Sequence, residues 1–148
     1  MSGWLRERLA RSIRGRVLDV GCGEGRYLPD RGVGVDIDPD RLRAALARSP
    51  RVAVADAHHL PFADGAFDTV LAIRMLNATG AIDDALREIR RVLARDGRLL
   101  VYTRARRSAG GDRLDADNGL ERLRPFFSSV EVEREPDEER GALFIARR

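Results

Sequence analysis

The chain of 148 residues contains no lysine, and all 27 of its basic residues are arginine. No ε-amino group is therefore available as a base or for a Schiff base with a carbonyl substrate. The only cysteine, Cys22, excludes an internal disulfide bond. A lone cysteine fits a reducing compartment, and we expect a cytoplasmic protein. We expect no metal site.

Long hydrophobic runs are also missing from the sequence. No stretch approaches the roughly 18 apolar residues of a membrane-spanning helix, so we expect no membrane association. The arginine-rich residues 1–16 lack the apolar core of a secretory signal. Aromatic residues make up 5% of the chain and the net charge is +3, and neither value indicates nucleic-acid binding by itself. We expect one domain spanning residues 1–148.

Apolar strands alternate with helical patterns along most of the chain. The pattern predicts helices at residues 4–13, 39–48, 82–93 and 119–127, and a short helix that follows residue 25 and ends near Pro29. Strands are predicted at residues 16–20, 33–37, 51–55, 67–73 and 98–103, and the pair 129–134 and 142–147 reads as a hairpin. Strands separated by helices favour a parallel sheet. The expected fold is α/β: a Rossmann-like, seven-stranded, mostly parallel sheet with helices on both faces and a C-terminal antiparallel hairpin.

The strongest motif is a glycine loop that follows the first strand. Gly21, Gly23 and Gly25 follow the apolar segment 17–20 directly. Glycines let a backbone turn sharply and let a ligand approach closely. The spacing is GxGxG, whereas the dinucleotide-binding motif is GxGxxG. The alternative is a tight turn whose glycines serve geometry alone.

Two aspartates end the next two predicted strands. Asp36 lies 15 residues after the first loop glycine, where a carboxylate can accept hydrogen bonds from both ribose hydroxyls. Asp38 is explained as the cap of the following helix. Asp56 and Ala57 would lie beside Asp36 and near an adenine, although Asp56 can also be a simple turn residue.

These motifs resemble the class I methyltransferases that use S-adenosylmethionine (SAM), over residues 16–103. The resemblance includes residues 56–62, 67–71, 86–93 and 96–101 in the family's order and spacing. It implies SAM as the cofactor, with Asp19 and the three loop glycines at its methionine part. It further implies Asp36 at the ribose, Ile37 against the adenine, Asp56 and Ala57 at the adenine edge, and Ile73 facing the sulfonium. Cys22 would then be a small loop residue.

The resemblance does not identify the methyl acceptor. Residues 71–77 lack the Asn/Asp-Pro-Pro-aromatic motif of branches that methylate planar nitrogens, which argues against those branches. The candidates for a catalytic base are His58 and His59, the only histidines, and the alternative is a loop or cofactor contact.

The substrate side looks open, since only 15 residues precede the first strand and the segment after the fifth is short. A partner subunit or a second copy of the chain could complete the site. The candidate substrate-binding residues are arginines at the active-site edge, and they suit an anionic small molecule or RNA. Their alternative is a solvated loop. These candidates are Arg74, Arg104, Arg106 and Arg107, and Arg113 lies in the same segment.

The expected function is methyl transfer from SAM to an unidentified acceptor. The alternative is a non-catalytic SAM-binding subunit that supports a partner protein. A nucleotide-dependent oxidoreductase is a third possibility, and the GxGxG spacing and the residues around Asp56 count against it.

Overall fold

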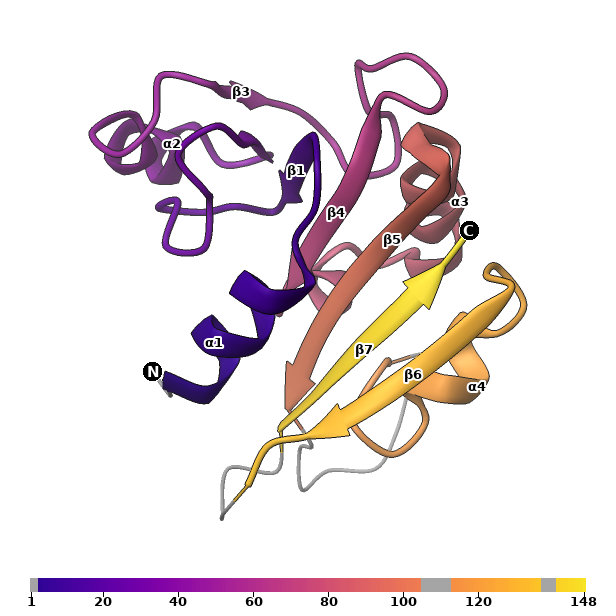
Figure 1. Ribbon diagram of the computed structural model, residues 1–148. Coiled ribbons are helices and arrows are strands. Elements are labelled where there is room, and N and C mark those ends of the chain that lie inside the picture. The colour runs from indigo at the N-terminus through magenta and orange to yellow at the C-terminus, as the bar shows by residue number, and fades with distance from the viewer. Residues whose placement is uncertain (1–2, 105–112, 137–140) are drawn as a thin grey trace.

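The computed structural model describes residues 3–104, 113–136 and 141–148. Seven strands form one sheet in the order β3-β2-β1-β4-β5-β7-β6, shown in Figure 1. The strands are β1 (Val17–Val20), β2 (Val33–Asp36), β3 (Val52–Val54), β4 (Phe67–Ile73), β5 (Leu93–Arg104), β6 (Ser129–Arg134) and β7 (Gly141–Arg147). Only β7 runs antiparallel to its neighbours, β5 and β6. The predicted mostly parallel sheet with a C-terminal hairpin is confirmed.

Helices cover both faces of this sheet, as predicted. They are α1 (Gly3–Ser12), α2 (Pro39–Leu46), α3 (Ile82–Val92) and α4 (Gly119–Leu123), with a 3-10 turn, η1 (Leu76–Ala78). In Figure 1, α1 lies in front of the sheet, whereas α3 and α4 lie behind it. No helix in the described part of the chain is long and apolar enough to cross a membrane.

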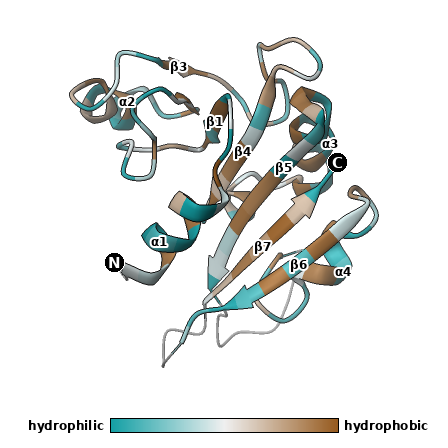
Figure 2. Ribbon diagram, viewed as in Figure 1, coloured by the Kyte–Doolittle hydropathy of each residue, from teal (hydrophilic) through white to brown (hydrophobic). Residues whose placement is uncertain are grey.

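The core is divided between the two faces by the alternation of side chains along the strands. Leu71 and Leu100 pack with α1 in one cluster, while Val70 and Leu99 pack with α3 in the other. Figure 2 shows the apolar residues concentrated in β4, β5 and β7, whereas the edge strand β6 alternates polar and apolar residues. Because both faces of the central strands are buried, they appear as almost continuous apolar runs in the sequence.

The helix expected after the glycine loop is absent, since the described residues 21–32 form successive turns between β1 and β2. Leu28 N–H donates to the Gly25 carbonyl, and Gly32 N–H donates to the Pro29 carbonyl. Pro29 cannot continue a helix that starts after Gly25, and the chain must rejoin the sheet at Val33. The side chains of Cys22 and Leu28 instead cover Gly34 in β2.

Strand β5 also differs from its prediction, because it begins at Leu93 directly after α3, five residues before the expected start, and includes Asp96 and Gly97. Its pairing with β4 shifts register between Phe67 and Thr69. The extra residues are absorbed in this irregularity, and the regular ladder then runs from Arg98.

Candidate functional site

The glycine loop turns sharply at the carboxyl end of β1. Gly21 and Gly23 have φ angles of 70° and 54°, a region that side-chain-bearing residues rarely adopt. A Cβ on Gly21 would lie 2.5 Å from Met75 Cβ, so this position tolerates only glycine. At Gly23 a Cβ would meet nothing within 4 Å, so the backbone there faces open space. The loop therefore exposes its backbone to a ligand.

Asp36 ties this loop to the end of β2. One carboxylate oxygen, Oδ2, accepts from Gly23 N–H at 2.8 Å, and Oδ1 accepts from Asp38 N–H at 2.9 Å. A carboxylate oxygen can accept two hydrogen bonds, so each oxygen can still receive a ligand hydroxyl. Asp38 caps α2 by accepting from Asp40 N–H, as predicted. Asp36 therefore has a structural role that its position in the sequence did not indicate.

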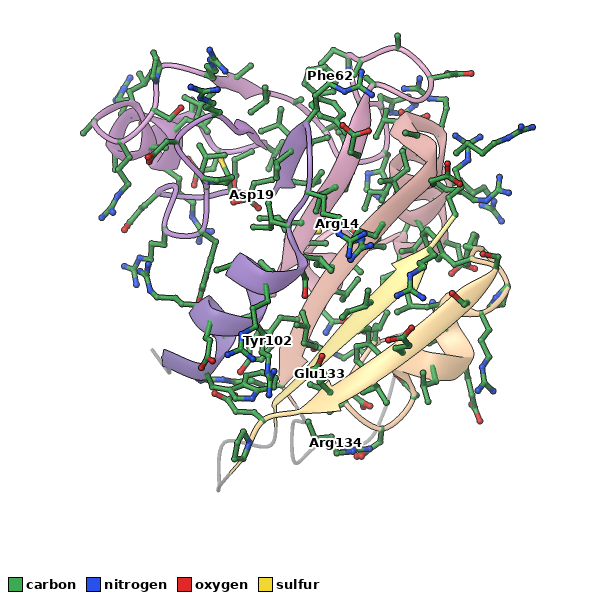
Figure 3. All side chains as sticks on the ribbon, in the orientation of Figure 1. Arg14, Asp19, Phe62, Tyr102, Glu133 and Arg134 are labelled. Carbon is green, nitrogen blue, oxygen red and sulfur yellow. The ribbon has the colours of Figure 1, made fainter. Side chains whose placement is uncertain are left out.

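Asp19 lies deeper, in β1, where the residue is 2% exposed and lines the same cavity. Figure 3 shows it at the end of β1 that faces the loop region. Its carboxyl group makes no hydrogen bond or ion pair with another residue in the described part of the chain. Burial, together with the nearby charge of Asp36, raises the pKa of Asp19 to about 8. A bound cation would stabilise the ionised carboxylate.

The neighbouring Cys22 is unsuited to nucleophilic chemistry. Burial, with smaller contributions from Asp19 and Asp36, raises its pKa to about 12. The side chain packs beside Leu42 and Ala45 of α2. Cys22 is therefore a packing residue of the loop.

The third loop, after β3, is organised by Asp56. Its Oδ1 accepts from His58 N–H at 2.9 Å and lies 2.7 Å from His58 Nδ1. The hydrogen bond from the His58 backbone, helped by its side chain, lowers the pKa of Asp56. The second ring nitrogen, His58 Nε2, lies 3.1 Å from the Ala81 carbonyl oxygen. Both ring nitrogens are therefore engaged with protein oxygens.

These three loops and the end of β4 enclose a cavity of about 880 Å³. Ile37 is 68% exposed at its wall, which leaves an apolar surface for a planar ring. His59 is exposed and does not line the cavity, and Gly25 packs against Ala45 instead of lining it. The predicted cofactor residues that do line the cavity are Asp19, Gly21, Gly23, Asp36, Ile37, Asp56, Ala57 and Ile73.

The predicted substrate arginines are only partly described. Arg74 follows β4, is exposed and lines the cavity, and its N–H donates to the Tyr102 carbonyl. Arg104 ends β5, with its Nε 3.5 Å from the Tyr102 hydroxyl. Figure 3 shows Tyr102 near the lower end of β5, beside α1. Arg106 and Arg107 lie outside the described residues. The sequence pattern did not indicate that α1 places Arg6 beside Tyr27, a residue that lines the cavity.

A second hollow, of about 800 Å³, lies between α3, α4 and the C-terminus. It is lined by charged and aromatic residues such as Arg87 and Phe126, and Arg87 pairs with Asp84. None of the glycine-loop or strand-end residues reaches it, so the first cavity is the candidate active site.

Comparison with known proteins agrees with this geometry. A family model described as "Methyltransferase domain" matches residues 18–101, more than half of the chain. The chain belongs to the class I SAM-dependent methyltransferase family. The match runs from the first strand through most of β5, and therefore includes all three loops of the cavity.

Among the relatives, a malonyl-[acyl-carrier protein] O-methyltransferase of Geobacter sulfurreducens is 41% identical over 95 residues, covering 55% of this chain and 36% of that protein. Methyltransferase GfsG of Streptomyces halstedii is 36% identical over 116 residues, covering 68% of this chain and 42% of that protein. The chain thus spans less than half the length of these two relatives.

Solved structures share the fold. The [4+2]-cyclase SpnF has a TM-score of 0.69 at 30% identity, covering 88% of this chain and 58% of that one. A Thermotoga maritima SAM-dependent methyltransferase has a TM-score of 0.79 at 18% identity, covering 96% and 87%, which shows the fold alone. The same fold therefore also occurs in a protein that is named for a reaction other than methyl transfer.

Proposed function

We propose that this chain binds SAM in the cavity and transfers its methyl group to an acceptor at the cavity mouth. The observation that carries the proposal is Asp19, a buried carboxyl group without a protein partner that faces the cavity. SAM carries an ammonium group that can supply the missing positive charge. Buried carboxylates are costly unless paired, so the position is explained by a cationic ligand.

The other cavity residues fit the remaining parts of SAM. Asp36 retains acceptor capacity for ribose hydroxyls, and Ile37 offers an apolar surface to the adenine. Asp56 keeps its Oδ2 for the exocyclic amine of adenine, because both contacts of His58 use Oδ1. Gly23 leaves room beside the loop backbone.

When bound, SAM supplies an activated methyl group on a cationic sulfur. The residues of the chain contribute binding, orientation and exclusion of water, which are sufficient for an acceptor that is already nucleophilic. Since both nitrogens of His58 are engaged and His59 does not line the cavity, the site fits an acceptor that needs no histidine base. A carboxylate, a thiolate or an ionised phenol meets this condition.

Methyl transfer can be tested with SAM labelled in its methyl group. The purified chain would be incubated with separated metabolite, RNA and protein fractions, with Asp19→Asn as the matched control. The proposal predicts label in at least one fraction with the wild-type chain and, at SAM concentrations below saturation, much less label with the control. Binding of SAM without label in any fraction would contradict methyl transfer by the chain alone.

That outcome would favour the second candidate, a SAM-binding subunit without transferase activity. Its support is the relation to a structure named as a [4+2]-cyclase, together with the lack of a free histidine base in the described cavity. A partner protein is part of this candidate. A fold neighbour, 18% identical, is a putative methyltransferase in complex with the Haloferax volcanii Trm112 methyltransferase activator.

A further inference from the structure

A cluster of arginines surrounds Tyr27 at the mouth of the cavity. Tyr27 lies in the loop between β1 and β2 and lines the cavity. Arg6 of α1 places its guanidinium carbon 5.9 Å from the centre of the Tyr27 ring. Burial raises the pKa of Tyr27, and the charges of Arg6, Arg74, Arg104 and Arg26 oppose this rise. Geometry places Arg6 over the Tyr27 ring, and it places Arg26 and Arg74 in the lining of the same cavity as Tyr27.

These arginines come from four separate parts of the chain. Arg6 lies in α1, Arg26 in the glycine loop, Arg74 after β4 and Arg104 at the end of β5. Arg26 pairs with Glu24 at 3.0 Å. No carboxylate pairs with Arg6 or Arg74 in the described part of the chain. The charges of Arg6 and Arg74, which lack a carboxylate partner there, favour an anion at this point.

The backbone of Arg74 supports a role for its side chain. It is the only described non-glycine residue with positive φ, at 60°. Such a conformation is unfavourable for a side-chain-bearing residue and persists where the surrounding structure imposes it, often at functional sites. Here the Arg74 N–H bonds to the Tyr102 carbonyl at 2.9 Å, while its exposed side chain lines the cavity.

We propose that the methyl acceptor is a small molecule with a carboxylate or phosphate group, which Arg74 and Arg6 bind beside the Tyr27 ring. This proposal rests on the proposed function, because the mouth is an acceptor site only if SAM occupies the inner cavity. Guanidinium groups bind both oxyanions through paired hydrogen bonds. The volume of about 880 Å³ must also hold the cofactor, so the part of the acceptor that enters the cavity must be small.

The test uses the full chain saturated with S-adenosylhomocysteine (SAH), the demethylated cofactor, and three probes of similar size. Benzoate and phenyl phosphate carry the two anions, and benzamide is the neutral counterpart of benzoate. Calorimetry is expected to show that at least one anion binds ~10-fold more tightly than benzamide. Equal binding of all three probes would overturn the proposal. The preferred anion identifies the acceptor group as carboxylate or phosphate.

Variants distinguish specific anion binding by Arg74 from the effect of the overall positive charge of the protein. Arg74→Gly removes the side chain and suits the positive φ, and it is expected to weaken anion binding ~10-fold while SAH affinity stays within about twofold. Arg74→Lys should retain part of the affinity. The control Arg95→Ala removes an exposed charge near the amino end of β5, at the opposite edge of the sheet, and should leave anion binding unchanged. Unchanged anion affinity in Arg74→Gly would refute the role of Arg74.

Two further outcomes are distinguishable. If the wild-type chain is folded but does not bind SAH, the proposed function fails, and the acceptor site fails with it. If SAH binds but a ten-residue oligouridylate binds over 100-fold more tightly than phenyl phosphate, with strong salt dependence, the mouth is an RNA phosphate site and the small-molecule proposal is wrong.

Discussion

Replacing the buried Asp19 by asparagine should stabilise the unliganded protein while impairing cofactor binding. The side chain is 2% exposed, and its pKa is raised from 3.8 to about 8 by burial and by Asp36. At pH 7 the unfolded chain has lost this proton and the folded chain has mostly kept it. The linkage cost is about 4 kcal/mol, from roughly 1.4 kcal/mol for each pH unit between 3.8 and 7.

Asparagine removes this cost because it has no charge to lose. Its buried amide brings one additional unpaired donor, which costs about 1 kcal/mol. The expected net gain for Asp19→Asn is therefore about 3 kcal/mol at pH 7, measured by urea unfolding of the unliganded protein. Since the folded pKa lies above the unfolded one, wild-type stability falls as the pH rises from about 4 to about 8. The gain should vanish between about pH 4 and pH 5, where the linkage cost equals the cost of the buried amide.

The same substitution should weaken SAH binding at least ~10-fold, because the ligand ammonium loses a charged acceptor. Equal unfolding midpoints of wild type and variant at pH 7, with no pH-dependent difference between pH 4 and pH 8, would refute the argument from burial. A more stable variant that binds SAH normally would show that Asp19 does not bind the cofactor.

Three further predictions concern the loops around the cavity. Asp36→Ala should weaken SAH binding by about 1–3 kcal/mol in calorimetry and also loosen the loop, because Gly23 N–H loses its acceptor; unchanged affinity would show that Asp36 does not bind the ribose. His58→Asn should weaken SAH binding several-fold but leave the maximal transfer rate within about tenfold, whereas loss of ~100-fold or more in rate at saturating SAM would indicate a catalytic base. Cys22, with its pKa raised to about 12, should resist iodoacetamide at pH 8 in the folded chain and react after unfolding, and rapid modification of the native protein would contradict its burial.

The sheet and its main helices were predictable because their periodicity is strong. The apolar residues Ile82, Leu86 and Ile89 lie on one helical face, and all three are buried in α3. The nearly continuous apolar segment 67–73 forms the central strand β4. The helix is buried on one face and the strand on both faces, and each kind of burial produces a characteristic spacing of apolar residues in the sequence.

The connections between these elements were less predictable, because their structure depends on the number of residues between one strand and the next. A helix after Gly25 agrees with the motif, but Pro29 and the return of the chain at Val33 leave turns in its place. The early start of β5 at Leu93 was hidden by Asp96 and Gly97, which usually indicate a turn. Local residue preference could not show that pairing with β4 would extend the strand through them.

The position of the cavity was predictable, whereas several contacts of its lining residues were not. The strand-end residues Asp19, Asp36 and Asp56 all line one cavity, because parallel strands bring their carboxyl ends to one edge. The second hydrogen-bonding partner of His58, the Ala81 carbonyl, lies 23 residues away in the chain and has no sequence signal. Arg6 was missed for the same reason, since its contact with Tyr27 depends on the position of α1.

Calorimetric titration of the folded chain with SAH and with NAD tests the central claim most directly. The geometry of the three loops predicts one SAH site with a dissociation constant in the micromolar range and binding of NAD at least ~100-fold weaker. A folded sample that gives no heat with SAH, or that binds NAD as tightly as SAH, would contradict the assignment of this cavity to SAM.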